Sequence, residues 1–236
     1  MIMPAIHGYI DRRILINYKL DPEVAARVIP APFRPLLYNG SAIAGICLIR
    51  LKNIRPKGFP GSLGIDSENG AHRFAVEWDE NGITKHGVYI PRRDTSSVIN
   101  ALAGGRIFPG KHYRAKFSVD EQNGNYNVGF VSSDATTLSV SASESGIFND
   151  TSIFESLNAA SVFFQNGCVG YTPARNGFEG IKLHTCTWQV QPLAVHNVQS
   201  SYFEDEKVFP KGSVIFDNAL LMKNIEHEWQ ILHKLT

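Results

Sequence analysis

The chain has 236 residues, which exceeds the usual length of one domain, although β-barrels and β-sandwiches reach this size as a single unit. Charged residues make up only 19% of it and the formal net charge is +1, so the basic surplus typical of nucleic-acid-binding proteins is missing. No apolar run approaches the roughly 18 residues that cross a membrane, and the first residues lack the pattern of a secretion signal. We therefore expect a single domain over residues 1–236 that binds a small molecule, with neither nucleic acid nor a membrane as partner.

Cysteine and histidine usage argues against a bound metal. The three cysteines, Cys47, Cys168 and Cys186, are an odd number, are widely spaced and form no Cys-x-x-Cys pair. The eight histidines are scattered and show no ligand-pair spacing on a helical pattern. We expect no metal, no cofactor and a reducing, cytoplasmic location.

The first third of the chain predicts strands around one short helix. Asp21-Pro22 offers an N-cap followed by proline at the first helical position, and Pro30 ends the helix. Strands are expected at Ile14–Leu20 before it and at Ala42–Leu51 after it.

The middle of the chain predicts hairpins. Alternating apolar residues from 72 to 78, the turn Asn81-Gly82 and a second run at Ile83–Ile90 indicate one hairpin. Residues 111–142 alternate in the same way around the turns Asn123-Gly124 and Asp134-Ala135, which indicates an antiparallel meander.

Two further helices are expected. Asp94-Thr95 would cap a helix that ends at Gly104-Gly105, and the capping box formed by Ser152 and Glu155 would begin a longer one that ends at Gly167. The last part of the chain predicts strands at Ile181–Val190, Leu193–Phe203 and Ser213–Met222. Leu221–Leu232 stays unassigned, because its apolar spacing fits a helix while the run before it looks extended.

This order of elements favours a many-stranded antiparallel sheet that forms a barrel or a folded sandwich. The repeated strand and helix units of a doubly wound α/β domain are missing from the pattern.

Candidate site residues lie between Leu63 and Pro109. Glu68 is expected in a turn bracketed by Gly64 and Gly70, and if it is buried it needs a cationic partner or a raised pKa. Arg93 follows a predicted strand, where an arginine can hold a carboxylate through two parallel hydrogen bonds. Loop-fixing pairs of Arg93 with Asp94, or of Arg92 with Glu68, are the alternative.

Several segments resemble acetoacetate decarboxylases, and others more closely resemble uncharacterised YqjF-like conserved bacterial proteins of the same superfamily. The first likeness covers Tyr18–Phe33, Leu63–Gly70, Leu193–Ser200, Phe209-Pro210 and Val214–Asp217. The second covers Ala42–Leu51, Arg55–Gly58, Pro91–Ser97 and Phe203–Glu206. The resemblance implies a mainly β (α+β) fold, an acetoacetate decarboxylase-like antiparallel β-barrel or cone with a few short helices and an apolar cavity, and a tendency to assemble as a homo-oligomer.

The resemblance also implies site residues. The family's active-site glutamate corresponds to Glu68, and its arginine near the first strand falls at Arg12 or Arg13, of which we keep Arg12. Where the decarboxylases carry the lysine that forms a Schiff base, this chain has Gly104, Gly105 and Arg106. Arginine stays protonated near neutral pH, so it cannot form that imine.

The leading hypothesis is a protein that binds a small organic acid or keto compound in a barrel cavity. Arg12, Arg93 and Arg106 would hold the carboxylate, and Glu68 would be the catalytic acid or base of a lyase-type or isomerase-type reaction without an imine. Two alternatives stay open: a non-catalytic barrel whose polar residues form structural pairs, and an enzyme that uses a relocated lysine, Lys85 or Lys111.

Overall fold

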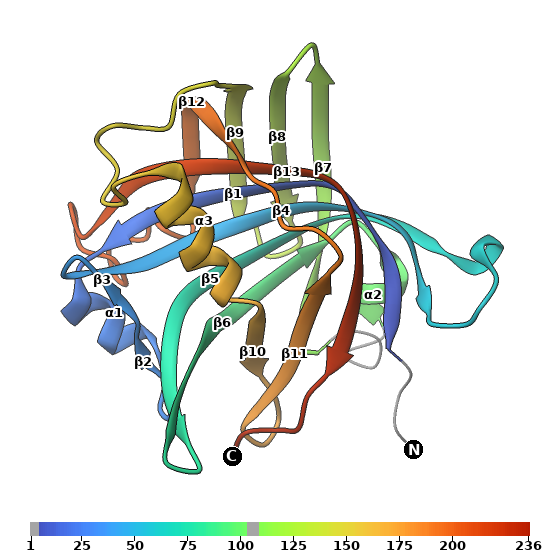
Figure 1. Cartoon of the computed structure of the whole chain (residues 1–236), viewed down its shortest axis with the longest axis horizontal. Coiled ribbons are helices and arrows are strands. Elements are labelled where there is room, and N and C mark those ends of the chain that lie inside the picture. The colour runs from blue at the N-terminus through green and yellow to red at the C-terminus, as the bar shows by residue number, and fades with distance from the viewer. Residues whose placement is uncertain (1–4, 103–108) are drawn as a thin grey trace.

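The computed structural model describes residues 5–102 and 109–236, and most of these residues lie in long, curved strands (Figure 1). Three α-helices are described, α1 (Pro22–Val28), α2 (Val98–Leu102) and α3 (Leu157–Asn166), together with the 3₁₀ turn Gly61–Leu63. The strands are β1 (Ile6–Leu20), β2 (Arg34–Pro35), β3 (Leu37–Tyr38), β4 (Ser41–Pro56), β5 (Ile65–Glu80), β6 (Ile83–Thr95), β7 (His112–Gln122), β8 (Asn125–Ser132), β9 (Thr137–Glu144), β10 (Val169–Pro173), β11 (Phe178–Thr185), β12 (Gln191–Ser200) and β13 (Val214–Ile231).

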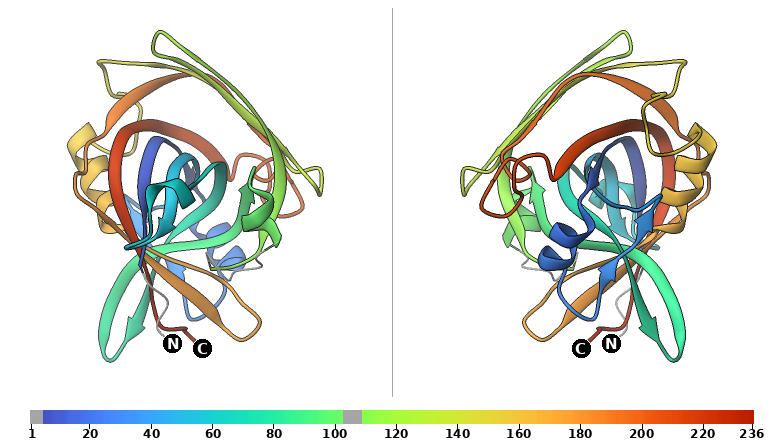
Figure 2. Two further views of the ribbon diagram at one scale, coloured as in Figure 1. Left: turned by 90° about the vertical axis from the view of Figure 1, so that its right-hand side faces the viewer. Right: turned by 90° about the vertical axis from the view of Figure 1, so that its left-hand side faces the viewer.

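The sheet closes on itself twice and so forms two rings. A larger ring runs β6-β7-β8-β9-β12-β13-β1-β4-β5 and returns to β6. A smaller ring runs β13-β1-β4-β5-β6-β10-β11 and returns to β13. Most pairings are antiparallel, but β6 meets β7 and β10 in short parallel contacts. Figure 2 shows the wide ring with α3 outside it.

The strands common to both rings have two buried faces. Successive side chains of a strand point to opposite sides, so Arg12 and Ile14 of β1 face one ring while Arg13 and Leu15 face the other. This explains why β4 carries a nearly continuous apolar run instead of alternating apolar and polar residues. One sheet thereby serves two separate cores.

The two cores are filled differently. In the larger ring, Phe74, Phe203 and Phe209 belong to an aromatic cluster whose neighbouring ring centroids lie 5.4 to 6.4 Å apart. The second core includes Ile10, Leu15 and Cys47 from the shared strands, packed against Phe154 and Phe164 from α3 and the segment before it. The larger ring thus has a packed aromatic centre, and the cavity described below lies in the smaller one.

The meander and the predicted strands are confirmed, except that the strand expected at Ile181–Val190 ends at Thr185. The unassigned Leu221–Leu232 segment is strand as far as Ile231. The first helix is also confirmed: Asp21 accepts hydrogen bonds from the backbone N–H groups of Glu23 and Val24. The predicted start of the long helix is wrong, because Ser156 is its N-cap and Ser152 instead bonds to Asp217.

Two local predictions near the candidate site are also wrong. Glu68 and Gly70 lie inside β5 instead of a turn, and a Cβ on Gly70 would stand 2.8 Å from Phe130 Cε1. Packing, not turn geometry, therefore requires that glycine. Asp94 does not cap a helix, since it lies in β6 as a buried ion-pair partner of Arg92.

None of the described helices is long and apolar enough to span a membrane.

Candidate functional site

The smaller ring encloses a cavity of about 120 Å³ to which all seven of its strands contribute. An engineered cavity of about 150 Å³ holds one benzene molecule, so this space suits about five or six non-hydrogen atoms. Phe164 and Gly167, from the end of α3, help to close it. Strand residues in the lining are Ile10, Arg13, Cys47, Ile49, Leu51, Asn69, Gly70, Ala71, Arg73, Val88, Ile90, Arg93, Asp94, His112, Gly170, Ile181, Leu183 and Trp229.

Three arginines give this apolar cavity a positive wall. Arg13, Arg73 and Arg93 come from β1, β5 and β6. Nε and Nη1 of Arg13, and Nε and Nη2 of Arg93, are buried and donate to no partner among the described residues. Burial lowers the pKa of Arg93 to about 10, which records the cost of holding that charge away from water.

The acidic residue in the lining does not neutralise these charges. Asp94 accepts hydrogen bonds from Arg92 Nε at 2.9 Å and from Arg92 Nη2 at 2.7 Å, and a third bond comes from Ser132. Its charge is therefore engaged by Arg92, a fourth arginine that is absent from the lining and that also pairs with Asp134 at 2.6 Å. Within the described part of the chain, three arginines thus share this lining with one carboxylate that is already paired, an arrangement typical of binding sites.

A chain of buried amides holds Arg73 in place. Its Nη2 donates to Asn17 Oδ1, Asn17 Nδ2 donates to Asn218 Oδ1 at 2.8 Å, and Asn218 Nδ2 reaches Asp217 Oδ2 at 2.6 Å. The Arg73 guanidinium also lies 4.9 Å from the ring centroid of Phe164. A buried, charge-assisted network of this kind fixes the direction in which the guanidinium points.

Cys47 lies among these cations. Arg73 Nε donates to its sulfur at 3.2 Å, and Arg13 Nη2 lies 3.6 Å from the same atom. Burial alone would raise the pKa of the thiol, but the positive charges of Arg13 and Arg73 outweigh that effect and lower it.

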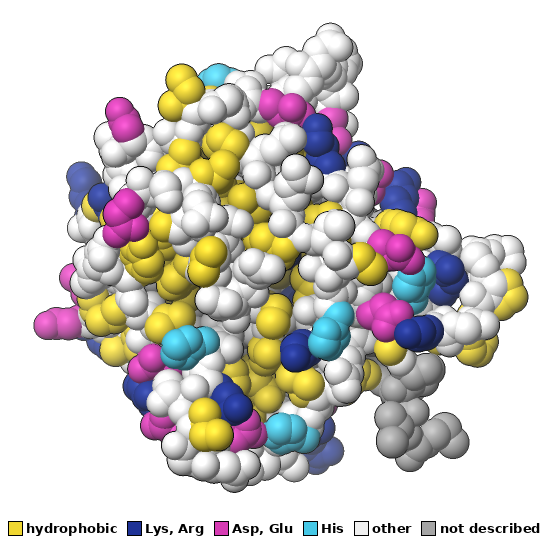
Figure 3. Space-filling model, in the orientation of Figure 1, with side chains coloured by type: hydrophobic (Ala, Val, Ile, Leu, Met, Phe, Trp, Pro, Cys, Tyr) yellow, Lys and Arg dark blue, Asp and Glu magenta, His cyan; other side chains and the backbone are white. Residues whose placement is uncertain are grey.

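A second cavity, of about 210 Å³, adjoins the first. Arg13, Arg73 and Phe164 line both spaces, and the second is otherwise walled largely by apolar residues of β1, β5 and α3 and of the segment around Tyr38. Figure 3 shows the face that carries α3, where apolar side chains gather near the middle and charged ones lie mostly around them.

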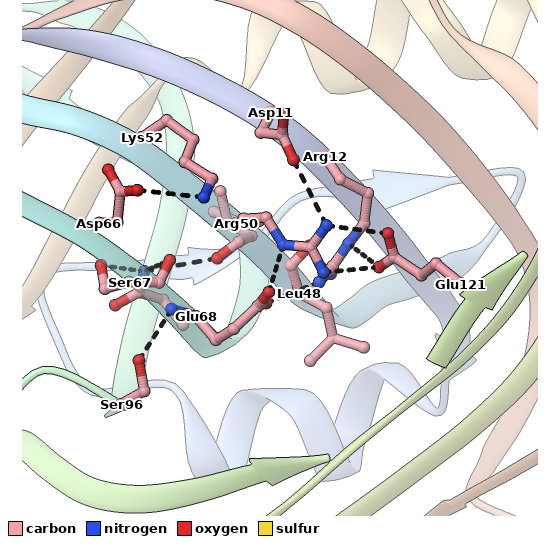
Figure 4. A network of polar contacts seen from close by, with 12 residues as sticks. Asp11, Arg12, Leu48, Arg50, Lys52, Asp66, Ser67, Glu68, Ser96 and Glu121 are labelled. Carbon is pink, nitrogen blue, oxygen red and sulfur yellow. Dashed lines mark hydrogen bonds and ion pairs between the residues drawn. The ribbon is translucent and has the colours of Figure 1, made fainter. Parts of the chain in front are cut away.

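Glu68 and Arg12, which the resemblance gave as site residues, contact each other on the other face of the shared strands (Figure 4). Arg12 Nη2 lies 2.6 Å from Glu68 Oε2, and its Nε lies 2.8 Å from Glu121 Oε1. Arg50 contacts the same two carboxylates, at 2.5 Å for Glu68 and 3.0 Å for Glu121. These four residues, two arginines and two glutamates, are here called the ion cluster, and Asp11 adds a third carboxylate at 3.4 Å from Arg50 Nη1.

The other sequence candidates are separated from the ion cluster. Arg93 lines the cavity of the smaller ring, whereas Glu68 and Arg12 are absent from that lining. Arg106 falls outside the described residues. Lys85 is exposed, and Lys111 is exposed with its Nζ 4.4 Å from the ring centroid of Tyr113. No lysine is found among the described residues that line the two cavities.

Arg73 and Cys47 were missed from the sequence, and Arg13 was set aside in favour of Arg12. Arg73 lies among the alternating residues of the predicted hairpin, between His72 and Phe74, and so had to face the opposite side. A charged residue on the second face of an otherwise buried strand is the sequence signal that points to Arg73.

The chain belongs to the DUF2071 family. The family model, described as an uncharacterized conserved protein (COG2071), matches residues 10–218. None of the curated proteins matches the chain.

Solved structures show that the fold is that of acetoacetate decarboxylase. The acetoacetate decarboxylase of Legionella pneumophila has 12% identity and a TM-score of 0.65, over 98% of this chain and 88% of that one. An acetoacetate decarboxylase-like enzyme of Sphingomonas wittichii RW1 has 11% identity and a TM-score of 0.57, over 98% and 94%. The enduracididine biosynthesis enzyme MppR, solved with pyruvate, has 10% identity and a TM-score of 0.58, over 100% and 93%.

Proposed function

We propose that this protein binds a small organic acid in the cavity of the smaller ring, with the carboxylate held by Arg13, Arg73 and Arg93. The observation that carries the proposal is the set of buried N–H groups of Arg13 and Arg93 that have no partner among the described residues. A carboxylate would accept hydrogen bonds from these groups and bring a negative charge next to the arginines. It would therefore offset both the buried, unbonded N–H groups and the buried positive charge.

The size of the space favours a short acid. At about 120 Å³ the cavity suits a molecule of three or four carbons, such as a 2-oxo or 3-oxo acid. The complex of MppR with pyruvate is in keeping with this choice, because that similarly folded protein binds an acid of the same size. The ligand class proposed is therefore a short keto acid.

The residues in the lining favour chemistry without an imine. A Schiff base needs a neutral amine within reach of the bound keto group, and no described residue of the lining is a lysine. Decarboxylation by the Schiff-base route is therefore not what we propose.

Glu68 is better explained as a partner of buried Arg12 than as an acid or base for this ligand. Arg12 is only 2% exposed and needs a compensating charge, which Glu68 and Glu121 provide. We also propose that residues 1–236 form a single domain, because five strands belong to both rings and neither ring closes without them.

Calorimetric titration tests the proposed function. Pyruvate, acetoacetate and the neutral analogue acetone are titrated into the purified protein at neutral pH. We expect binding of the acids, at least a tenfold loss of affinity in Arg93→Met, and unchanged affinity in the matched surface variant Arg34→Gln. Failure of every acid to bind, or equal affinity for acetone, would contradict the proposal.

The relocated-lysine alternative has its own test. Sodium borohydride reduction in the presence of acetoacetate, followed by peptide mass spectrometry, would reveal an adduct on Lys85 or Lys111 if either forms an imine. We expect no adduct at either position.

A further inference from the structure

Cys47 is placed in the cavity by the two neighbouring shared strands. In the β4 register it pairs with Leu15 of β1 and Ala71 of β5, and its side chain points into the smaller ring. The residue is only 4% exposed, so the cavity itself is the space that its sulfur faces.

The surroundings of this sulfur differ from those of an ordinary buried cysteine. A thiol in an apolar core is an inert small hydrophobe, because burial disfavours the thiolate. Here Arg73 Nε donates to the sulfur at 3.2 Å and Arg13 Nη2 lies at 3.6 Å. Two guanidiniums within hydrogen-bonding range of one sulfur favour its negatively charged form.

The same guanidiniums serve the sulfur and the cavity. Arg13 uses Nη2 toward Cys47, and its Nε and Nη1 stay buried without a described partner. Arg93 adds two further unpartnered nitrogens in the same lining. An anion bound to these groups would lie in the same small space as the sulfur.

We propose that Cys47 is a nucleophile that attacks the electrophilic carbon of the acid bound in this cavity. The inference rests on the proposed function and adds a reactive group to it. With a 2-oxo acid, the thiolate sulfur forms a bond to the keto carbon and the π electron pair of the C=O bond moves onto its oxygen. The resulting hemithioketal alkoxide keeps the one negative charge that the thiolate brought, and the step needs no oxidant or reductant.

The arginines would assist this step in two ways. Bound to the carboxylate, they hold the neighbouring carbon within reach of the sulfur. The alkoxide that forms also lies in a positively charged, enclosed space, where guanidinium donors stabilise a developing negative charge. Cys168, which also lines the cavity but has no described arginine contact, lacks this arrangement.

Competitive alkylation tests the proposal within a single chain. The folded protein is treated at neutral pH with iodoacetate or with iodoacetamide, and the rate at each cysteine is read by peptide mass spectrometry. In both reactions the sulfur forms a bond to carbon and iodide leaves. Ordinary thiols react more slowly with the anionic reagent than with the neutral one, and exposed Cys186 provides that reference.

We expect the iodoacetate-to-iodoacetamide rate ratio at Cys47 to exceed that at Cys186 by at least tenfold, and pyruvate to slow the reaction at Cys47 but not at Cys186. Arg13→Gln should lower the ratio at Cys47 at least fivefold, and the surface variant Arg34→Gln should leave it unchanged. Arg13 makes no described ion pair, and a thermal melt confirms that its variant is folded. If the Arg13→Gln variant is not folded, the rate ratio at Cys47 in the wild-type protein and its protection by pyruvate test the proposal without it.

The outcomes separate this inference from the proposed function. If the titration shows acid binding but Cys47 is unreactive, or its iodoacetate-to-iodoacetamide rate ratio equals that of Cys186, Cys47 is not the nucleophile. The proposed binding site would be unaffected by that result. Absence of acid binding would remove both. Reaction of Cys47 with iodoacetate that pyruvate does not slow would also overturn the inference, because the anion would then not share the space in front of the sulfur.

Discussion

Arg93 carries a buried charge without an ion-pair partner among the described residues, and this makes a specific prediction about stability. Its Nε and Nη2 are buried without a described partner, and burial lowers its pKa to about 10. Replacing it with methionine keeps most of the side-chain volume and removes the desolvated charge. We expect Arg93→Met to raise the free energy of unfolding by about 1 to 3 kcal/mol, measured by urea denaturation, while it weakens acid binding. A destabilised variant would mean that an unrecognised partner holds this guanidinium.

Glu68 should behave in the opposite way. Glu68→Gln leaves Glu121 as the one carboxylate of the ion cluster for buried Arg12 and half-buried Arg50, while Asp11 still lies 3.4 Å from Arg50. We expect a loss of about 3 to 5 kcal/mol in the free energy of unfolding and no change in acid affinity. The matched control is Glu77→Gln, which breaks a more exposed pair with Arg34 and should cost less than about 1 kcal/mol. If Glu68→Gln lowers the affinity for the acid as well as the stability, Glu68 takes part in binding the acid.

Sequence reasoning found the types of residue at the site better than their positions. It expected arginines to bind an acid, yet it chose Arg12 where the cavity has Arg13. These neighbours lie on one strand and point to opposite faces, so a one-residue error moves the side chain from one ring to the other. Cys47 gave no signal, because its arginine partners come from other strands and meet it only in the folded chain.

At the scale of elements, α3 shows how a tertiary contact overrides a local pattern. Ser152 and Glu155 have the spacing of a capping box, but Ser152 Oγ donates to Asp217 at 2.6 Å and Glu155 accepts from Tyr38. The helix therefore begins four residues later than predicted, with Ser156 as its N-cap. Asp217 is buried and accepts a hydrogen bond from the backbone of the segment before the helix. This contact joins residues far apart in the sequence, so a local sequence pattern could not reveal it.

The cap itself can be tested. Ser156 Oγ accepts from the backbone N–H of Ala159 at 3.1 Å, so Ser156→Ala should cost about 1 kcal/mol and Ser156→Asp should restore most of it. Because Ser156 caps the start of α3, hydrogen exchange should accelerate in the first turn of α3 in the alanine variant. Exchange that is unchanged in α3 would show that packing of Phe164, not the cap, holds the helix.

At the scale of the whole molecule, the sequence predicted the strands but not the two rings. Alternation and turn residues identify hairpins such as β5–β6, because both strands are close in sequence. Ring closure depends on pairs such as Ile181 with Ile231 and Gly170 with Val88, which are distant in sequence and carry no local signature. The barrel was predicted from the resemblance to acetoacetate decarboxylases, and the fold comparison confirms it.

Two buried histidines make the whole molecule sensitive to acid. Burial lowers the pKa of His72, in the larger ring, to about 3, and that of His227, in the smaller ring, to about 4. Both values lie below the roughly 6.5 of an unfolded chain, so the unfolded state binds more protons as the pH falls below 6.5. Folding stability should therefore be nearly constant above pH 7 and decrease as the pH falls from 6.5 toward 4.

The slope of that decrease identifies the groups responsible. Two histidines that bind protons only on unfolding give a slope approaching about 2.7 kcal/mol per pH unit, at about 1.36 kcal/mol for each proton. We expect His72→Leu and His227→Leu each to remove about half of it between pH 6.5 and 5, in urea denaturation at a series of pH values. His196, which is exposed, provides the control substitution. Stability that is flat down to pH 5 in the unmodified protein would mean that both imidazoles are protonated in the folded state, each with a counter-charge that the described contacts lack.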